Sequence, residues 1–205
     1  MASNLLWKPD QDQIDHRNLT AFAEQHGFTP DDFPALHEWS INSQESFWSS
    51  VWSFCDIVGD PGDNVIIDPD TFPGSRWFPQ ASLNFSENLL RHDDAHVALV
   101  AITEQGKRAE MTYTELRIEV AKFAAELKDR GVETGDRVAG WMPNVMETVI
   151  AMLGTASLGA VWSSCSPDFG IEGALDRFGQ IEPKVLVACD GYTYNGKTYD
   201  ITSNV

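Results

Sequence analysis

Between residues 96 and 191 the chain alternates short apolar runs with longer stretches in which apolar residues recur at helical spacing. The short runs are rich in β-branched residues and are bounded by turn-forming residues, which is typical of buried strands. The expected strands cover residues 96–102, 137–142, 160–164 and 185–189, and the expected helices cover 113–130, 145–158 and 170–181. Strands that alternate with helices of this length predict parallel pairing, βαβ units and a layered α/β sheet.

In a sheet of this kind, ligands bind beyond the carboxyl ends of the strands. The loops that follow the last three expected strands are therefore where a functional site is expected. They carry few groups suited to catalysis. Trp141 is expected in the core, Asp168 is expected to cap a helix, and Cys165 has no histidine near it in sequence to act as a base. We therefore expect no catalytic residue in this chain.

Two of the expected helices carry clear start signals. Thr112 and Glu115 have the spacing of a capping box, and Asn144 and Glu147 repeat that spacing before the second helix. Gly154, in the middle of the second helix, allows a neighbouring helix to approach closely. We interpret these residues as determinants of fold stability.

Residues 1–90 differ from the rest of the chain. They are rich in aromatic residues and lack β-branched runs, and their apolar spacing predicts helices at about 17–26, 30–38 and 43–56. A long loop punctuated by proline and glycine follows. The change in pattern predicts two domains, a helical extension over residues 1–90 and an α/β segment over 91–205.

The chain is strongly acidic, with 31 Asp and Glu against 14 Lys and Arg and a formal net charge of −17. Such a surface repels phosphates, so we expect neither nucleic acid nor a membrane as partner. Cys55, Cys165 and Cys189 fit no disulfide framework and are expected to be small buried side chains. The five histidines lack metal-ligand spacing, and the first fifteen residues do not resemble a secretory signal. We predict no metal site and a cytoplasmic location.

Several segments resemble the opening of the acyl-adenylate-forming synthetases, the superfamily of acyl-CoA synthetases, luciferases and peptide-synthetase adenylation domains. MTYTEL (111–116) resembles the first core motif of that family, and LGTASLGAVWSSCSPDF (153–169) resembles the second. GVETGDRVAGWMPN (131–144) is similar to the linker between them.

Upstream, RWFPQASLNFSENLL (76–90) resembles the segment that short-chain acyl-CoA synthetases carry ahead of the adenylation domain. The start LLWKPD, residues 33–54 and SPDFG (166–170) are most similar to the acetoacetyl-CoA synthetases within this family. The resemblance covers residues 5–205.

The resemblance implies a helical extension over residues 1–90 and the first part of an AMP-binding domain over 91–205. It also implies a two-step reaction for the whole enzyme. A carboxylate, here acetoacetate, attacks the α-phosphate of ATP to give an acyl-adenylate and pyrophosphate, and the thiol of CoA then displaces AMP. The first step requires Mg²⁺ and a glycine-rich loop, because charge on the phosphoryl oxygens must be neutralised. The implied partners are acetoacetate, ATP and CoA.

The glycine-rich phosphate loop of the family, which ends in Pro-Lys, does not occur in these 205 residues, and neither do the later motifs. We therefore expect the chain to be the N-terminal part of a ligase. Alone, it is expected to be inactive and to bind none of these cofactors tightly. Two other interpretations stay open. In the first, the chain is a non-catalytic CoA-binding, nucleotide-binding or assembly module. In the second, it is one half of a split enzyme similar to acetyl- or propionyl-CoA synthetase.

One binding element of the family falls inside this chain. The loop DGYTYNGK (190–197) matches a basic loop with which acetyl-CoA synthetases contact the nucleotide end of CoA. The matching positions are Tyr194, Asn195, Gly196 and Lys197. Lys197 would place a positive charge near the 3′-phosphate, and Tyr194, which stands where the family has arginine, would stack on adenine. The alternative is a simple glycine turn with an exposed lysine.

Overall fold

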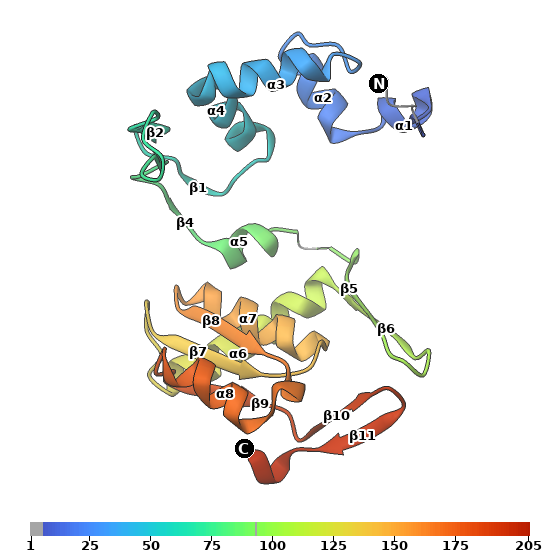
Figure 1. Cartoon of the computed structure of the whole chain (residues 1–205), viewed down its shortest axis with the longest axis vertical. Coiled ribbons are helices and arrows are strands. Elements are labelled where there is room, and N and C mark those ends of the chain that lie inside the picture. Colours follow the sequence, from blue (N-terminus) through green and yellow to red (C-terminus); the bar gives the residue numbers. More distant parts are fainter. Residues whose placement is uncertain (1–5, 93) are drawn as a thin grey trace. The chain divides into compact units, whose positions relative to one another are not determined.

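The computed structural model describes residues 6–92 and 94–205, and the chain divides into two compact units, Met1–Ser82 and Leu83–Val205 (Figure 1). The domain boundary expected after residue 90 stays a prediction.

The first unit is helical, as its apolar spacing predicted. The three expected helices are present as α2 (Asn18–Gln25), α3 (Phe33–Asn42) and α4 (Gln44–Phe54). Phe22, at the centre of their buried cluster, makes edge-to-face ring contacts with Phe47 and Phe54. The aromatic residues of this segment therefore form a small core between the helices.

Short elements of the first unit were not predicted. α1 (Gln11–Asp15) spans only five residues, too few to show apolar periodicity, and begins at a capping box formed by Asp10 and Gln13. The long loop after α4 contains four two-residue strands in two hydrogen-bonded pairs. They are β1 (Gly59–Asp60) with β4 (Ser82–Leu83), and β2 (Ile66–Ile67) with β3 (Arg76–Trp77).

The second unit is built around a three-stranded parallel sheet. β7 (Arg137–Trp141) lies between β8 (Val161–Cys165) and β9 (Val185–Ala188), so the strand order is β8-β7-β9. The expected α/β class and these three expected strands are confirmed. The unit also contains a short helix before the sheet, α5 (Phe85–Leu89), which the sequence pattern did not predict.

The first expected strand lies outside this sheet. β5 (Val97–Ile102) pairs antiparallel with β6 (Arg108–Thr112), a strand that the sequence analysis missed. The connection between them, residues 103–107, is short enough for an antiparallel hairpin, whereas parallel strands need a crossover of a dozen or more residues. The prediction that residues 96–102 pair in parallel with the other strands was therefore wrong.

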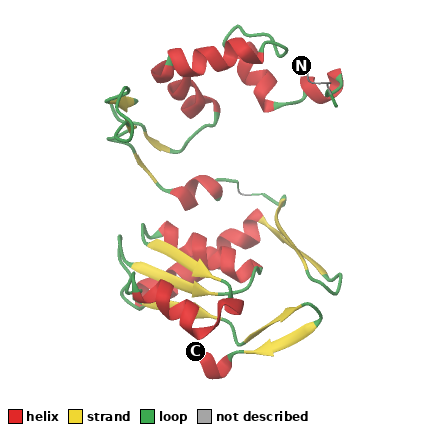
Figure 2. Ribbon diagram, viewed as in Figure 1, coloured by secondary structure: helices red, strands yellow, loops and turns green. Residues whose placement is uncertain are grey.

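Helices cover both faces of the parallel sheet. The three expected helices are α6 (Tyr113–Asp129), α7 (Met146–Ser157) and α8 (Gly170–Gly179). Neighbouring residues of β7 point to opposite faces. Val138 packs with Leu127 of α6, while Ala139 and Trp141 pack with Phe178 of α8. Figure 2 shows the strands between these helices. Trp141, only 3 % exposed, is a core residue as expected.

One of the predicted caps is confirmed and two were wrong. The Thr112 hydroxyl accepts the N–H of Glu115 at 3.2 Å, and the Glu115 carboxylate accepts the N–H of Thr112 at 2.8 Å. The N-cap of α7 is Val145 instead of Asn144, and it makes no side-chain cap. Asp168 lies in a 3₁₀ turn (Pro167–Phe169), because the Pro-Asp-Phe turn displaces the start of α8 to Gly170.

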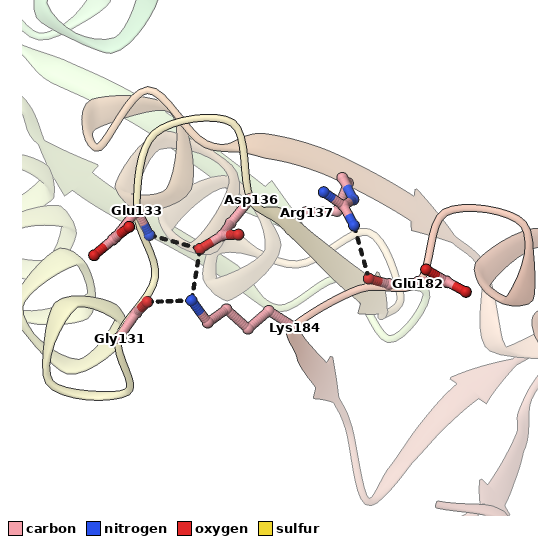
Figure 3. Close-up of polar contacts among 6 residues, drawn as sticks. All are labelled: Gly131, Glu133, Asp136, Arg137, Glu182 and Lys184. Carbon is pink, nitrogen blue, oxygen red and sulfur yellow. Dashed lines mark hydrogen bonds and ion pairs between the residues drawn. The ribbon is translucent and has the colours of Figure 1, made fainter.

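The amino end of the sheet is closed by a polar cluster (Figure 3). The Lys184 ammonium donates to the Asp136 carboxylate at 2.8 Å and also to the Gly131 carbonyl. The N–H of Glu133 donates to the same Asp136 oxygen at 2.8 Å. Arg137 donates through Nε to the carbonyl of Ile181 at 2.8 Å. This cluster ties the start of β7 to the segment before β9, at the end of the sheet opposite the candidate site.

The cysteines do not all behave as expected. Cys165 is buried and Cys189 is half-buried, but Cys55 is exposed because α4 ends just before it. The prediction that all three are buried was wrong for Cys55. In the part of the chain that the structure describes, no helix combines the length and hydropathy needed to cross a bilayer.

Candidate functional site

A cavity of about 750 Å³ lies beyond the carboxyl ends of β7 and β8. Four segments line it: the connection between β5 and β6, the loop 143–147, the residues just after β8, and the strand β10 (Gly191–Tyr194). Three of these segments follow the last three expected strands, where the parallel topology predicted a site, and the third of them forms the strand β10. The antiparallel β5–β6 pair adds a wall that the sequence analysis did not include.

The lining of this cavity is acidic. Glu104, Glu147 and Asp168 contribute three carboxylates, and no lysine or arginine is among the lining residues, all of which the structure describes. A triphosphate group would be repelled by this lining unless cations came from another part of the protein. Across residues 6–92 and 94–205, no three side chains of His, Cys, Asp or Glu gather as a metal site. The lining therefore offers no cationic side chain to the phosphates of ATP.

The thiols near the carboxyl ends of the strands are poor nucleophiles. Burial raises the pKa of Cys165, and burial also raises the pKa of Cys189. Both sulfurs are therefore protonated thiols at neutral pH, and attack by sulfur requires the thiolate.

The four predicted CoA-binding residues lie together at the tip of a β-hairpin. β10 pairs antiparallel with β11 (Lys197–Asp200), and Tyr194 faces Lys197 in the last pair of the ladder. Asn195 and Gly196 form the two-residue turn, with φ of 51° and 71°. Two consecutive residues with positive φ are what a type I′ hairpin turn requires, and asparagine followed by glycine suits it best.

One face of the hairpin carries an aromatic row. Because residues two apart on a strand share a face, Tyr192 and Tyr194 lie on the same side as their partners Tyr199 and Lys197. The rings of Tyr192 and Tyr199 stack with centroids 5.1 Å apart and an interplanar angle of 16°. Tyr194 is 62 % exposed. The tip thus presents a free ring beside an ammonium group.

A residue of the site that the sequence analysis missed is Glu104. It lies in the connection between β5 and β6, and its two carboxylate oxygens accept the backbone N–H groups of Asn195 at 2.8 Å and Gly196 at 3.0 Å. These two hydrogen bonds lower the pKa of Glu104, so the carboxylate is ionised at neutral pH. No local pattern marks this residue, because its partners lie more than ninety residues away in the chain.

Two family models match parts of this chain. The family model described as "AMP-binding enzyme" matches residues 85–203, and the model described as "Acetyl-coenzyme A synthetase N-terminus" matches residues 33–89.

Two curated relatives and one solved structure extend over nearly the whole chain. Acetoacetyl-coenzyme A synthetase from Rhizobium meliloti (strain 1021) is 44 % identical, over 100 % of this chain and 32 % of the relative. Acetoacetyl-CoA synthetase from Danio rerio is 41 % identical, over 98 % and 31 % respectively. The solved structure of acetoacetyl-CoA synthetase from Streptomyces lividans superposes with a TM-score of 0.89 at 42 % identity, over 97 % of this chain and 32 % of that one.

The chain thus spans about a third of the length of the relatives it matches. The match to the AMP-binding model alone covers more than half of its residues. This chain belongs to the family of AMP-binding enzymes.

Proposed function

We propose that the chain is the N-terminal part of a ligase that converts acetoacetate, ATP and CoA into acetoacetyl-CoA, AMP and pyrophosphate. The observation that carries this proposal is the similarity to acetoacetyl-CoA synthetases, which extends over the helical unit and the sheet unit together. The reaction would pass through an acetoacetyl-adenylate, as the family resemblance implies. In this proposal residues 1–90 are the extension and residues 91–205 the first part of the AMP-binding domain.

The proposal assigns the adenylation chemistry to residues beyond this chain. The lining of the acidic cavity includes no lysine or arginine that could neutralise the triphosphate of ATP. When bound, Mg²⁺ would neutralise charge that develops on the phosphoryl oxygens. We accordingly expect the chain alone to show no ATP-dependent activity, and the whole protein to use ATP, Mg²⁺ and CoA.

Within this chain, the proposal assigns the nucleotide end of CoA to the β10–β11 hairpin. Lys197 offers an exposed ammonium group to a phosphate, and the exposed ring of Tyr194 offers a stacking surface to adenine on the same face. Asn195 and Gly196 shape the turn, and their N–H groups are already bonded to Glu104. A single exposed charge contributes only about 0–1 kcal/mol, so this contact would assist binding without dominating it.

A second substrate deserves a test because one matching model describes an acetyl-CoA synthetase N-terminus. Acetate would then replace acetoacetate in the same reaction. We also propose a cytoplasmic location and small-molecule partners only, with neither nucleic acid nor a membrane among them.

The test uses the native protein, captured from cell extract with an antibody raised against residues 1–205. It is incubated with ATP, Mg²⁺ and CoA plus acetoacetate, acetate or propionate, and the acyl-CoA products are identified by mass spectrometry. We expect acetoacetyl-CoA as the main product and none from residues 1–205 alone. Preferential formation of acetyl- or propionyl-CoA would contradict the acetoacetate assignment. No acyl-CoA from any acid would favour a binding or assembly module.

A further inference from the structure

Glu104 lies in the connection between β5 and β6, whose backbone is held by hydrogen bonds. The N–H of Thr103 donates to the carbonyl of Lys107 at 2.9 Å, and the N–H of Gly106 donates to the carbonyl of Thr103 at 2.9 Å. Gly106 has a φ of 74°, which glycine adopts without steric cost. The backbone on either side of Glu104 is therefore fixed by its own hydrogen bonds.

The tip of the β10–β11 hairpin has few other anchors. Its ladder ends at the pair Tyr194–Lys197, and residues 193–200 are exposed. At its base, the N–H of Ile201 donates to the carbonyl of Asp190 at 2.9 Å and closes the ladder, and the buried Ile201 side chain anchors this end of the hairpin. An isolated two-stranded hairpin is marginally stable in water. A contact at the tip therefore matters for its orientation.

Glu104 supplies that contact in a specific way. Each of its carboxylate oxygens accepts one N–H, from Asn195 and from Gly196, the two turn residues beyond the end of the ladder. Hydrogen bonds to a charged acceptor are stronger than neutral ones, and two together fix direction as well as distance. The residues on either side of the turn are Tyr194 and Lys197.

We propose that Glu104 is a positioning residue for CoA: it holds the hairpin tip so that Tyr194 and Lys197 face the nucleotide, an inference that rests on the proposed function. Glu104 itself does not contact CoA in this account. Its negative charge would repel phosphates, so any benefit comes from orientation of the tip.

The two variants Glu104→Gln and Glu104→Ala test the proposal in the whole protein. Glu119→Gln is the matched control, because it removes the same charge from an exposed carboxylate on α6 whose partner is the Lys122 side chain at 2.7 Å. Two quantities are measured. One is hydrogen exchange of the hairpin peptide by mass spectrometry, and the other is the steady-state dependence on CoA.

We expect faster hydrogen exchange at the hairpin in both Glu104 variants and none of this change in the control. Without the Glu104 contact, if the hairpin tip adopts its CoA-binding conformation for about a tenth to a third of the time, the KM for CoA rises about three- to tenfold. Acetoacetate-dependent ATP–pyrophosphate exchange does not require CoA and should keep its wild-type rate. A general loss of structure would lower both activities together.

The outcomes distinguish the contact between Glu104 and the hairpin tip from the proposed function. Unchanged hydrogen exchange in the Glu104 variants contradicts the claim that Glu104 holds the hairpin tip, whatever the activity. Faster exchange with an unchanged KM for CoA overturns the positioning role. A lower KM for CoA in Glu104→Ala also overturns it, because Glu104 would then occupy an anion site that a phosphate of CoA needs. If the wild-type protein forms no acyl-CoA, the proposed function fails and the positioning role fails with it. Hydrogen exchange still shows whether Glu104 holds the hairpin tip.

Discussion

Gly154 lies in α7 at a point where this helix packs closely against α6. A Cβ atom at this position would lie 2.8 Å from Phe123 Cδ1 and 3.3 Å from both the amide nitrogen of Ala124 and the carbonyl oxygen of Val120. The last two atoms belong to the backbone of α6, which cannot move without shifting the whole helix. Phe123 packs against the core beneath the sheet, so it has little room to yield.

Two opposing effects decide the result of Gly154→Ala. Alanine is favoured over glycine inside a helix by about 0.8–1.0 kcal/mol. Overpacking a tight interface costs about 1–3 kcal/mol. Because two of the three close contacts are to backbone atoms, we place the cost in the upper part of this range. The net prediction is a loss of about 1–2 kcal/mol in the free energy of unfolding.

Gly179→Ala is the matched control. Gly179 ends α8 and has no atom within 4 Å of an added Cβ, so only helix propensity acts there. We expect a gain of about 0.5–1 kcal/mol. Both variants are compared by urea unfolding followed by circular dichroism, with the slope m checked for constancy. If Gly154→Ala is as stable as the wild type while Gly179→Ala is stabilised, the argument from close helix packing is refuted.

Three further predictions use the same protein. Thr112→Ala removes the cap of α6 and should cost about 1 kcal/mol in urea unfolding; Thr112→Ser retains the hydroxyl, and an equal loss in both variants would contradict the cap. The ion pair with Lys184 and the N–H of Glu133 lower the pKa of Asp136, so its contribution to stability is present above the unfolded pKa of about 3.9 and is lost as the pH falls through the folded value. Asp136→Asn should therefore lose less stability than the wild type between pH 7 and pH 3, and equal losses would contradict the pairing. Lys197→Ala should raise the KM for CoA by up to about fivefold in the whole protein, whereas Lys128→Ala on α6 should not; equal effects would argue against a CoA contact.

The parts of the fold that depend on local pattern could be predicted from the sequence. β7, β8 and β9 are short apolar runs between helices, and their parallel pairing follows from that alternation. The capping box at Thr112 and Glu115 is also a local signal, since both residues lie within one turn.

The missed elements depend on context. β6 (Arg108–Thr112) carries charged residues and runs directly into the capping motif, so it contains no apolar run that would predict a strand. Its pairing partner β5 was then assigned to the wrong sheet. Asp168 looked like a cap because it follows a proline, but the Pro-Asp-Phe segment forms a turn of its own before α8 begins.

The same error explains why the contact between Glu104 and the hairpin could not be foreseen. Only when β5 pairs with β6 does the connection that carries Glu104 reach the turn at Asn195 and Gly196. The turn itself was visible in the sequence as an Asn-Gly pair. Its partner was not, because the two segments are brought together by the tertiary fold.

The adenylation step is the central claim, and ATP–pyrophosphate exchange in the absence of CoA tests it most directly. The native protein captured with an antibody to residues 1–205 is incubated with Mg²⁺, ATP and labelled pyrophosphate, with or without acetoacetate. The account predicts label in ATP only when acetoacetate is present, and weaker labelling with acetate or propionate. Absence of exchange with every acid, from protein that retains its native fold, would contradict it.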